Sequence, residues 1–180
     1  MKNAKNIIGD IEDTLVENKV DYQKIIDEFG QAPACQDRLK GKVFSLKEHV
    51  KGLVLALLSN QRPWGEIAKN IVQLEEIFYN YEPEALKSED PKVLESKVRA
   101  LKCGNRQIGK QCSYLAENIR TLEKIDNEYG SVDSFITSDN PEVIAKILSK
   151  PGSKKLHQVG FTLAMEYLRN VGVNIVKPDL

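Results

Sequence analysis

The chain has 180 residues, enough for one domain with a substantial core. Its 26 Lys and Arg residues balance 26 Asp and Glu residues, so net charge gives no support for nucleic-acid binding, and a basic face would have to be offset by acid elsewhere. Three cysteines, at positions 35, 103 and 112, form no metal signature and suit reduced, buried thiols. We find no apolar run of membrane length and no signal peptide, and therefore expect a cytoplasmic protein without a membrane partner.

The spacing of apolar residues predicts helices along the N-terminal part of the chain. Residues 4–18 are predicted to be helical, and Tyr22 to Phe29 a second short helix that ends at Gly30. The stretch 31–43 is predicted to be a linker. It separates an N-terminal segment, 1–43, from a domain of residues 44–180, and we expect the two to form one compact unit. The first helix places its large aliphatic residues on one face: Ile7, Ile8, Ile11, Leu15 and Val16.

Capping signals mark the helices of the second part. Ser45 and Glu48 have the spacing of a capping box, and an apolar helix follows to about Asn60. A long helix from about Arg106 to Glu128 is predicted to end at Gly130. No stretch reads convincingly as a strand, so the predicted class is all-α. Later helices are expected to carry proline in the first turn or a side-chain N-cap, at Pro63, Pro83, Pro91 and Pro141 and at Asp90 and Asn140.

The closing segment, 140–180, is predicted to be a helix, a tight turn, a second helix and an extended tail. The turn runs through Val159 and Gly160, and the second helix spans Phe161 to Val171. Gly172 is expected to be its C′ residue, because glycine readily adopts the left-handed conformation there. In the tail, Pro178 fixes the backbone directly before a single carboxylate, Asp179.

Two stretches of this part resemble the helix–hairpin–helix–Gly/Pro–Asp superfamily of DNA glycosylases. LHQVGFTLAMEYLRNVG…KPD, from Leu156 to Asp179, is similar to the helix–hairpin–helix element and the Asp loop that follows it. The usual L-P-G-V-G of the hairpin reads Leu156-His157-Gln158-Val159-Gly160 here. LLSNQ, ending at Gln61, resembles the L-L-S-x-Q motif. The resemblance covers about residues 44–180 and implies a helix–hairpin–helix glycosylase-like bundle.

The resemblance implies roles for individual residues. Asp179 would be the catalytic carboxylate, because it can stabilise the positive charge that develops on the sugar and orient water. Gln61 would face the DNA, where an amide can fill the gap that an extruded base leaves. Trp64 and Tyr114 are candidates for lining a base pocket, although a lone tryptophan after a helix-starting proline is more often a core residue, and Tyr114 is open to the same structural interpretation. The hairpin would bind phosphate through backbone N–H groups at a helix N-terminus and through nearby donors, and its DNA-binding residues would be Lys154, Lys155, His157, Val159, Gly160 and Thr162.

The resemblance also implies what the site lacks. Members that cut the DNA backbone use a lysine just after the hairpin glycine, and Thr162 occupies that position here, so a monofunctional enzyme is expected. No four-cysteine cluster motif occurs, so no iron–sulfur cluster, metal or other cofactor is expected. A further stretch, Leu101 to Lys110, resembles the family segment in which a short glycine turn leads into a helix with basic residues. The basic side chains from Lys97 to Lys110 could contact phosphate or could form an ordinary solvated face.

Each of these features also has an ordinary structural interpretation. Gln61 could simply end a helix, the hairpin could be a packed αα-hairpin, and Asp179 could be a residue of an exposed tail. The predicted function is hydrolysis of a damaged base from double-stranded DNA in base-excision repair. The alternative is a catalytically silent DNA-binding or structural domain on the same fold. The family continues beyond the Asp, so we expect a chain truncated just after it, and a homodimer through the apolar N-terminal face.

Overall fold

The computed structural model describes residues 4–21 and 31–175, and every regular element in these two ranges is a helix. The predicted all-α class is therefore confirmed. The elements are α1 (Ala4–Glu17), α3 (Ala32–Leu39), α4 (Leu46–Leu58), α5 (Trp64–Ala68), α6 (Ile71–Ile77), a 3-10 turn (Tyr79–Tyr81), α7 (Pro83–Ser88), α8 (Pro91–Ala100), α9 (Ile108–Tyr129), α10 (Val132–Ile136), α11 (Pro141–Ser149) and α12 (Phe161–Asn170).

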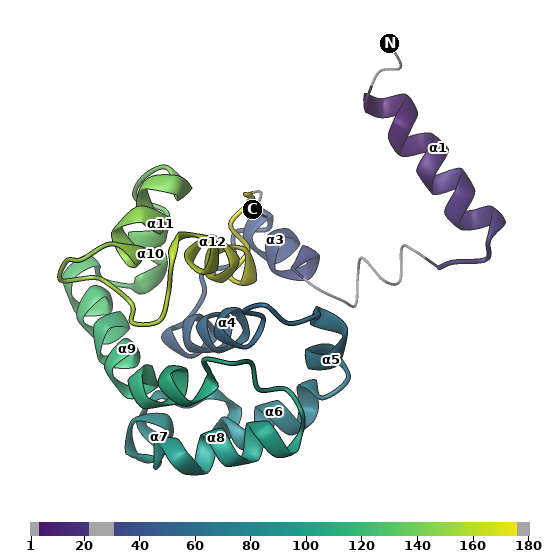
Figure 1. Ribbon diagram of the computed structural model, residues 1–180. Coiled ribbons are helices and arrows are strands. Elements are labelled where there is room, and N and C mark those ends of the chain that lie inside the picture. Colours follow the sequence, from purple (N-terminus) through teal and green to yellow (C-terminus); the bar gives the residue numbers. More distant parts are fainter. Residues whose placement is uncertain (1–3, 22–30, 176–180) are drawn as a thin grey trace.

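Helix α4 lies at the centre of the bundle, and it packs against α9 on one side and α12 on another (Figure 1). Its apolar residues occur on nearly every side of the helix, and from Gly52 to Leu58 each residue is buried. Helix α4 begins with the predicted capping box. The Ser45 hydroxyl accepts a hydrogen bond from the backbone N–H of Glu48, and the Glu48 carboxylate accepts one from the backbone N–H of Ser45.

The other predicted helix boundaries are largely confirmed. Pro83, Pro91 and Pro141 each stand in the first turn of a helix. The side chains of Asp90 and Asn140 cap their helices, as predicted. Pro63 differs, because it is the N-cap residue of α5 and so precedes the first turn. Gly130 ends α9 in the left-handed conformation, with a φ of 78°.

The prediction of a linker over residues 31–43 was wrong for its first part, because Ala32–Leu39 forms α3. This helix has no fully buried side chain and therefore no apolar stripe that a sequence pattern could reveal. It is fixed to the bundle by Arg38, which contacts Asp133 of α10 and the carbonyl oxygen of Val171. The helix predicted for Tyr22 to Phe29 lies outside the described residues.

At Gly172, directly after α12, the backbone lies close against that of α3. Gly172 is the C′ residue of α12, as predicted, and its φ is 79°. A Cβ atom on this residue would lie 2.3 Å from the carbonyl oxygen of Ala34, so only glycine allows the two backbones to approach this closely.

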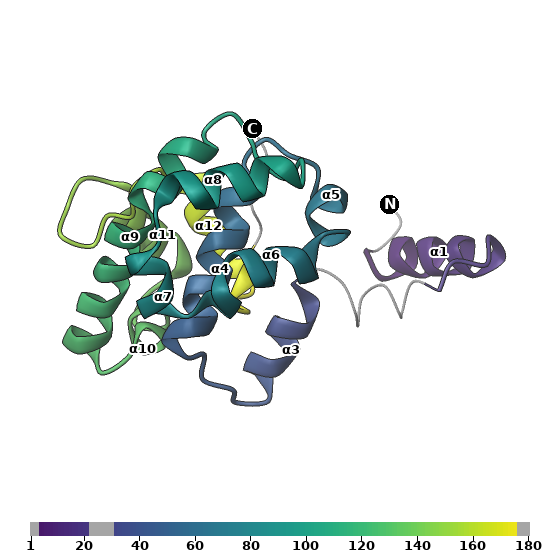
Figure 2. The ribbon, with the colours of Figure 1, turned by 90° about the horizontal axis from the view of Figure 1, so that it is seen from below.

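Helix α1 stands apart from the bundle in both views (Figures 1 and 2). Ile8 and Ile11 on this helix are accordingly exposed, by 57% and 53%. Within residues 4–21 and 31–175, no helix is long and apolar enough to cross a membrane.

Candidate nucleic-acid interface

The segment between α11 and α12 is the one for which a hairpin was predicted, and we call it the hairpin. After α11 ends, the backbone N–H of Leu156 donates to the carbonyl of Leu148, and that of Val159 donates to the carbonyl of Leu156. Leu156 and Val159 are buried beneath the turn, whereas Gly160 is exposed at the start of α12. In the two ranges that the structure describes, no side chain caps α12, so no described side chain accepts from its first N–H groups. Such a terminus can accept an anion.

The hairpin backbone is left-handed at Gln158, which has a φ of 61°. This conformation is unfavourable for residues other than glycine, so it needs support from the surrounding structure. Asn118, a fully buried residue of α9, provides that support next to it. Its side-chain amide donates to the carbonyl of His157 at 3.0 Å and accepts from the backbone N–H of His157 at 2.6 Å. Nothing in the sequence pattern around Asn118 had pointed to this role.

The basic side chains of the hairpin differ in whether a nearby carboxylate already contacts them. Lys154 donates to Glu128 at 2.8 Å and lies over the ring of Tyr129, and its side chain is only 15% exposed. The Nε2 atom of His157 lies 3.1 Å from a carboxylate oxygen of Glu117. Lys155, by contrast, has no ion-pair partner among the residues described. Of the two hairpin lysines predicted to contact DNA, Lys155 is therefore the one whose charge no described residue matches.

Tyr114 and Trp64, predicted to line one base pocket, are not brought together. Tyr114 stacks on His157, with ring centroids 4.6 Å apart and planes 6° apart, on the α9 side of the hairpin. Trp64 instead lines a separate groove of about 400 Å³ between α3, α4 and the α5–α6 region. We call it the Trp64 groove; its apolar lining residues include Pro33, Ala34, Phe44, Leu55, Ala68 and Ile71.

Gln61 lines a third region, a hollow of about 430 Å³ beside the turn between α8 and α9. Its own backbone is left-handed, with a φ of 53°, and the residue is exposed. None of the lining residues is acidic. We call this region the arginine hollow; it is lined by Gln61, Arg62, Arg99, Gly104, Asn105 and Arg106.

The arginine hollow is held in shape by two contacts. Arg62 donates to the carbonyl of Gly104 at 3.1 Å. The buried amide of Asn105 donates to the carbonyl of Leu57 at 2.9 Å and accepts from the backbone N–H of Gln107, which ties the α8–α9 turn to the end of α4. The basic run from Lys97 had indicated Arg99 and Arg106, but not Arg62 or Asn105, whose partners lie about 40 residues away or more.

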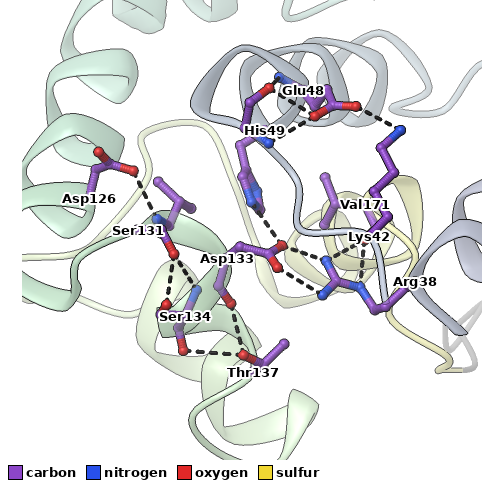
Figure 3. A network of polar contacts seen from close by, with 12 residues as sticks. Arg38, Lys42, Glu48, His49, Asp126, Ser131, Asp133, Ser134, Thr137 and Val171 are labelled. Atoms are coloured by element: carbon purple, nitrogen blue, oxygen red, sulfur yellow. Dashed lines mark hydrogen bonds and ion pairs between the residues drawn. The ribbon is translucent and has the colours of Figure 1, made fainter. Parts of the chain in front are cut away.

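A buried polar network lies around His49, near the start of α4 (Figure 3). The guanidinium of Arg38 donates to both oxygens of Asp133. His49 is fully buried and shares a hydrogen bond of 2.8 Å with the hydroxyl of Tyr167, and its Nε2 atom lies 3.3 Å from Asp133 at an angle too poor for a full hydrogen bond. The network joins α3, α4, α10 and α12, so it supports the frame on which the hairpin is built.

Protonation in this network follows from burial and from its contacts. Burial alone would raise the pKa of Asp133, but contacts with His49 and Arg38 outweigh it and hold the pKa at about 2. Burial lowers the pKa of His49 despite the nearby carboxylate, so this imidazole is neutral at neutral pH. Burial also raises the pKa of Tyr167. The network therefore contains one stable ion pair and two neutral rings.

Asp179, the predicted catalytic carboxylate, lies outside the described residues. Val159 is buried and Thr162 is half-buried near the exposed Gly160. Within the described part of the chain, no three His, Cys, Asp or Glu side chains lie close enough together to hold a metal ion.

In comparisons with known proteins, no protein-family model, no curated protein and no solved structure matches the chain.

Proposed function

We propose that the protein binds double-stranded DNA containing a damaged base and hydrolyses the N-glycosidic bond of that base. The observation that carries the proposal is the backbone of the hairpin. Gln158 stands where the glycosylase hairpin has a glycine, and it takes the left-handed conformation that favours glycine, at a φ of 61°. A left-handed residue at this position, followed directly by the start of α12, supports the resemblance.

The arginine hollow supports a nucleic-acid partner independently. Three arginines line a depression without an acidic neighbour in its lining, next to the amide of Gln61. Guanidinium groups bind phosphate oxygens in a two-point geometry, and an amide can both donate to and accept from a base edge. One of the three, Arg99, is matched by Glu95 at 2.8 Å, but Arg106 has no ion-pair partner among the described residues. A local basic surface thus exists although the net charge is +0.

In the proposed reaction, Asp179 acts on the sugar of an extruded nucleotide. The bond between the sugar carbon and the base nitrogen breaks, and the base leaves with the bonding electrons and takes up a proton. Positive charge develops on the sugar, and the carboxylate stabilises it and orients the water that adds to the sugar carbon. Thr162 offers no amine, so no imine forms and the DNA backbone stays intact.

A glycosylase screen tests the proposal. Duplexes with one alkylated, oxidised or deaminated base would be incubated with the protein and then cleaved at abasic sites by alkali. We expect strand cleavage on at least one duplex only after alkali, and no covalent adduct with borohydride. Asp179→Asn should abolish excision while DNA affinity remains, and the matched variant Asp139→Asn should behave as wild type. Excision by Asp179→Asn at the wild-type rate would remove this carboxylate from the mechanism.

The second candidate function is a catalytically silent domain on the same fold. The observation that favours it is the ion pair of Lys154 with Glu128, which matches the charge of this lysine within the protein, together with the contact of His157 with Glu117. Such a domain would bind DNA weakly or serve a structural role. Absence of excision across the whole screen, combined with salt-dependent binding to duplex DNA, would support this candidate over the enzyme.

A further inference from the structure

Helix α1 presents an apolar face that no described residue of the bundle covers. Ile8, Ile11 and Leu15 follow the helical spacing and lie on one face. Ile8 and Ile11 are each more than half exposed, although such side chains are normally withdrawn from water. The opposite face carries Asp13 and Glu17. A helix of 14 residues is marginal by itself, so this face is expected to pack against an apolar surface.

The Trp64 groove is an apolar surface of suitable kind. It is open to solvent and is lined by Phe44, Leu55 and Trp64, together with Ala68. Lys42, which also lines it, already contacts Asp37 at 3.1 Å and Glu48 at 2.9 Å. Lys51 likewise contacts Glu75 at 2.6 Å. Because these charges are matched within the protein, the groove suits an apolar occupant rather than a charged ligand.

The chain connection places α1 within reach of this groove. Residues 18–31 join α1 to α3, and a fully extended connection of this length spans up to about 46 Å. The connection ends beside the groove itself, because Pro33 and Ala34 at the start of α3 belong to its lining. Figures 1 and 2 show α1 on the side of the bundle where α3 and α5 lie. A short tether raises the effective concentration of α1 at the groove to the millimolar range, which favours the helix of the same chain over that of a second copy.

We propose that α1 docks its Ile8, Ile11 and Leu15 face into the Trp64 groove of its own chain. Docking removes both apolar surfaces from water and covers Trp64. The proposal does not rest on DNA binding or catalysis, since it concerns only α1 and the groove. It makes the N-terminal segment a detachable cover: any partner that reaches Trp64 must first displace α1.

Crosslinking to Cys35 tests which chain supplies the helix. Cys35 follows Ala34 on α3 and is partly exposed, whereas Cys103 and Cys112 are buried. Glu12→Cys places a thiol at the edge of the aliphatic face, and Asp13→Cys places one on the opposite face. With a short bismaleimide, we expect Glu12→Cys to form an intramolecular crosslink whose yield exceeds that of Asp13→Cys and does not change with protein concentration. The crosslink should disappear in a Cys35→Ser background.

Trp64 provides a second measurement, because it is the only tryptophan in the chain. Ile8→Ala combined with Ile11→Ala should shift its fluorescence to longer wavelength and increase its quenching by acrylamide. The matched pair Asp13→Ala with Glu17→Ala should leave both unchanged. Covalent dimers as the main product with Glu12→Cys would assign the groove to a second copy and overturn the proposal. Equal crosslink yields in the two cysteine variants, with unchanged Trp64 fluorescence, would also overturn it.

Discussion

Arg38 of α3 and Asp133 of α10 form a two-point ion pair, with nitrogen–oxygen distances of 3.1 and 2.6 Å (Figure 3). Both side chains are largely withdrawn from water, with 18% and 7% exposure. The same guanidinium donates to the carbonyl of Val171 at 3.0 and 2.7 Å, just after α12 ends. One side chain therefore connects three helices, and it does so for α3, which has no buried apolar residue to hold it in place.

The first prediction concerns removal of this pair. Asp133→Ala leaves a buried guanidinium without its carboxylate, and breaking a buried pair in this way costs roughly 3–5 kcal/mol. We expect a comparable decrease in the free energy of unfolding, measured by urea denaturation. Glu66→Ala is the control, because it breaks the exposed pair with Lys69 and should change the free energy by about 1 kcal/mol or less. Equal effects of the two variants would show that the Arg38 pair has no special structural role.

The second prediction follows from the protonation of the network. The pKa of Asp133 is lowered to about 2 in the folded protein, and that of His49 is also lowered. At both groups the unfolded chain binds more protons than the folded protein, so the free energy of unfolding decreases as the pH falls. His49 contributes this loss below the ordinary histidine pKa, and Asp133 contributes it at lower pH, towards pH 2. The urea midpoint should therefore decrease steadily from pH 7 to pH 3. Asp133→Asn should be less stable at pH 7 but should show a weaker dependence on pH below 4.

The third prediction compares two glycines with nearly equal φ, Gly172 at 79° and Gly130 at 78°. A Cβ at Gly130 would meet nothing within 4 Å, so Gly130→Ala should cost only the strain of a left-handed alanine, about 1–2 kcal/mol. A Cβ at Gly172 would overlap the carbonyl of Ala34. Gly172→Ala should therefore cost about 1–3 kcal/mol more, because backbone must move as well. Thermal or urea unfolding of the two variants measures the difference. Equal decreases in the free energy of unfolding would contradict the close approach of α3 to the end of α12.

The helices that could be predicted from sequence are those with local signals. The Ser45 capping box, the N-caps at Asp90 and Asn140, and the glycine that ends α9 each act within a few residues of one helix end. The second helix of the closing segment could be predicted from its apolar spacing and from Gly172. Helix α3 could not be predicted, because its stability depends on contacts of Arg38 with residues 95 and 133 positions away.

The candidate interface could be predicted only in part, for the same reason. The hairpin residues are contiguous in sequence, so a motif identifies them. The arginine hollow combines residues after the end of α4 with the α8–α9 turn. The hydrogen bonds of Asn118 with the backbone of His157 join residues 39 positions apart. Trp64 and Tyr114 were predicted to share a pocket, but a single sequence does not show which face of a bundle each side chain reaches.

The last prediction separates the two adjacent lysines of the hairpin. Lys154 is held by Glu128 and the ring of Tyr129, whereas Lys155 has no ion-pair partner within the described ranges. Each phosphate contact contributes about 0.9 to the slope of log affinity against log salt concentration. If the hairpin binds DNA, Lys155→Ala should weaken binding and reduce this slope by about 0.9, while Lys154→Ala should change it much less. Fluorescence anisotropy of a labelled duplex at several salt concentrations measures both quantities.

Circular dichroism and urea unfolding of each variant verify that the fold is retained. Equal slopes for Lys155→Ala and the wild-type protein would show that this lysine contacts no phosphate, and a salt-independent affinity would exclude backbone recognition by the hairpin altogether.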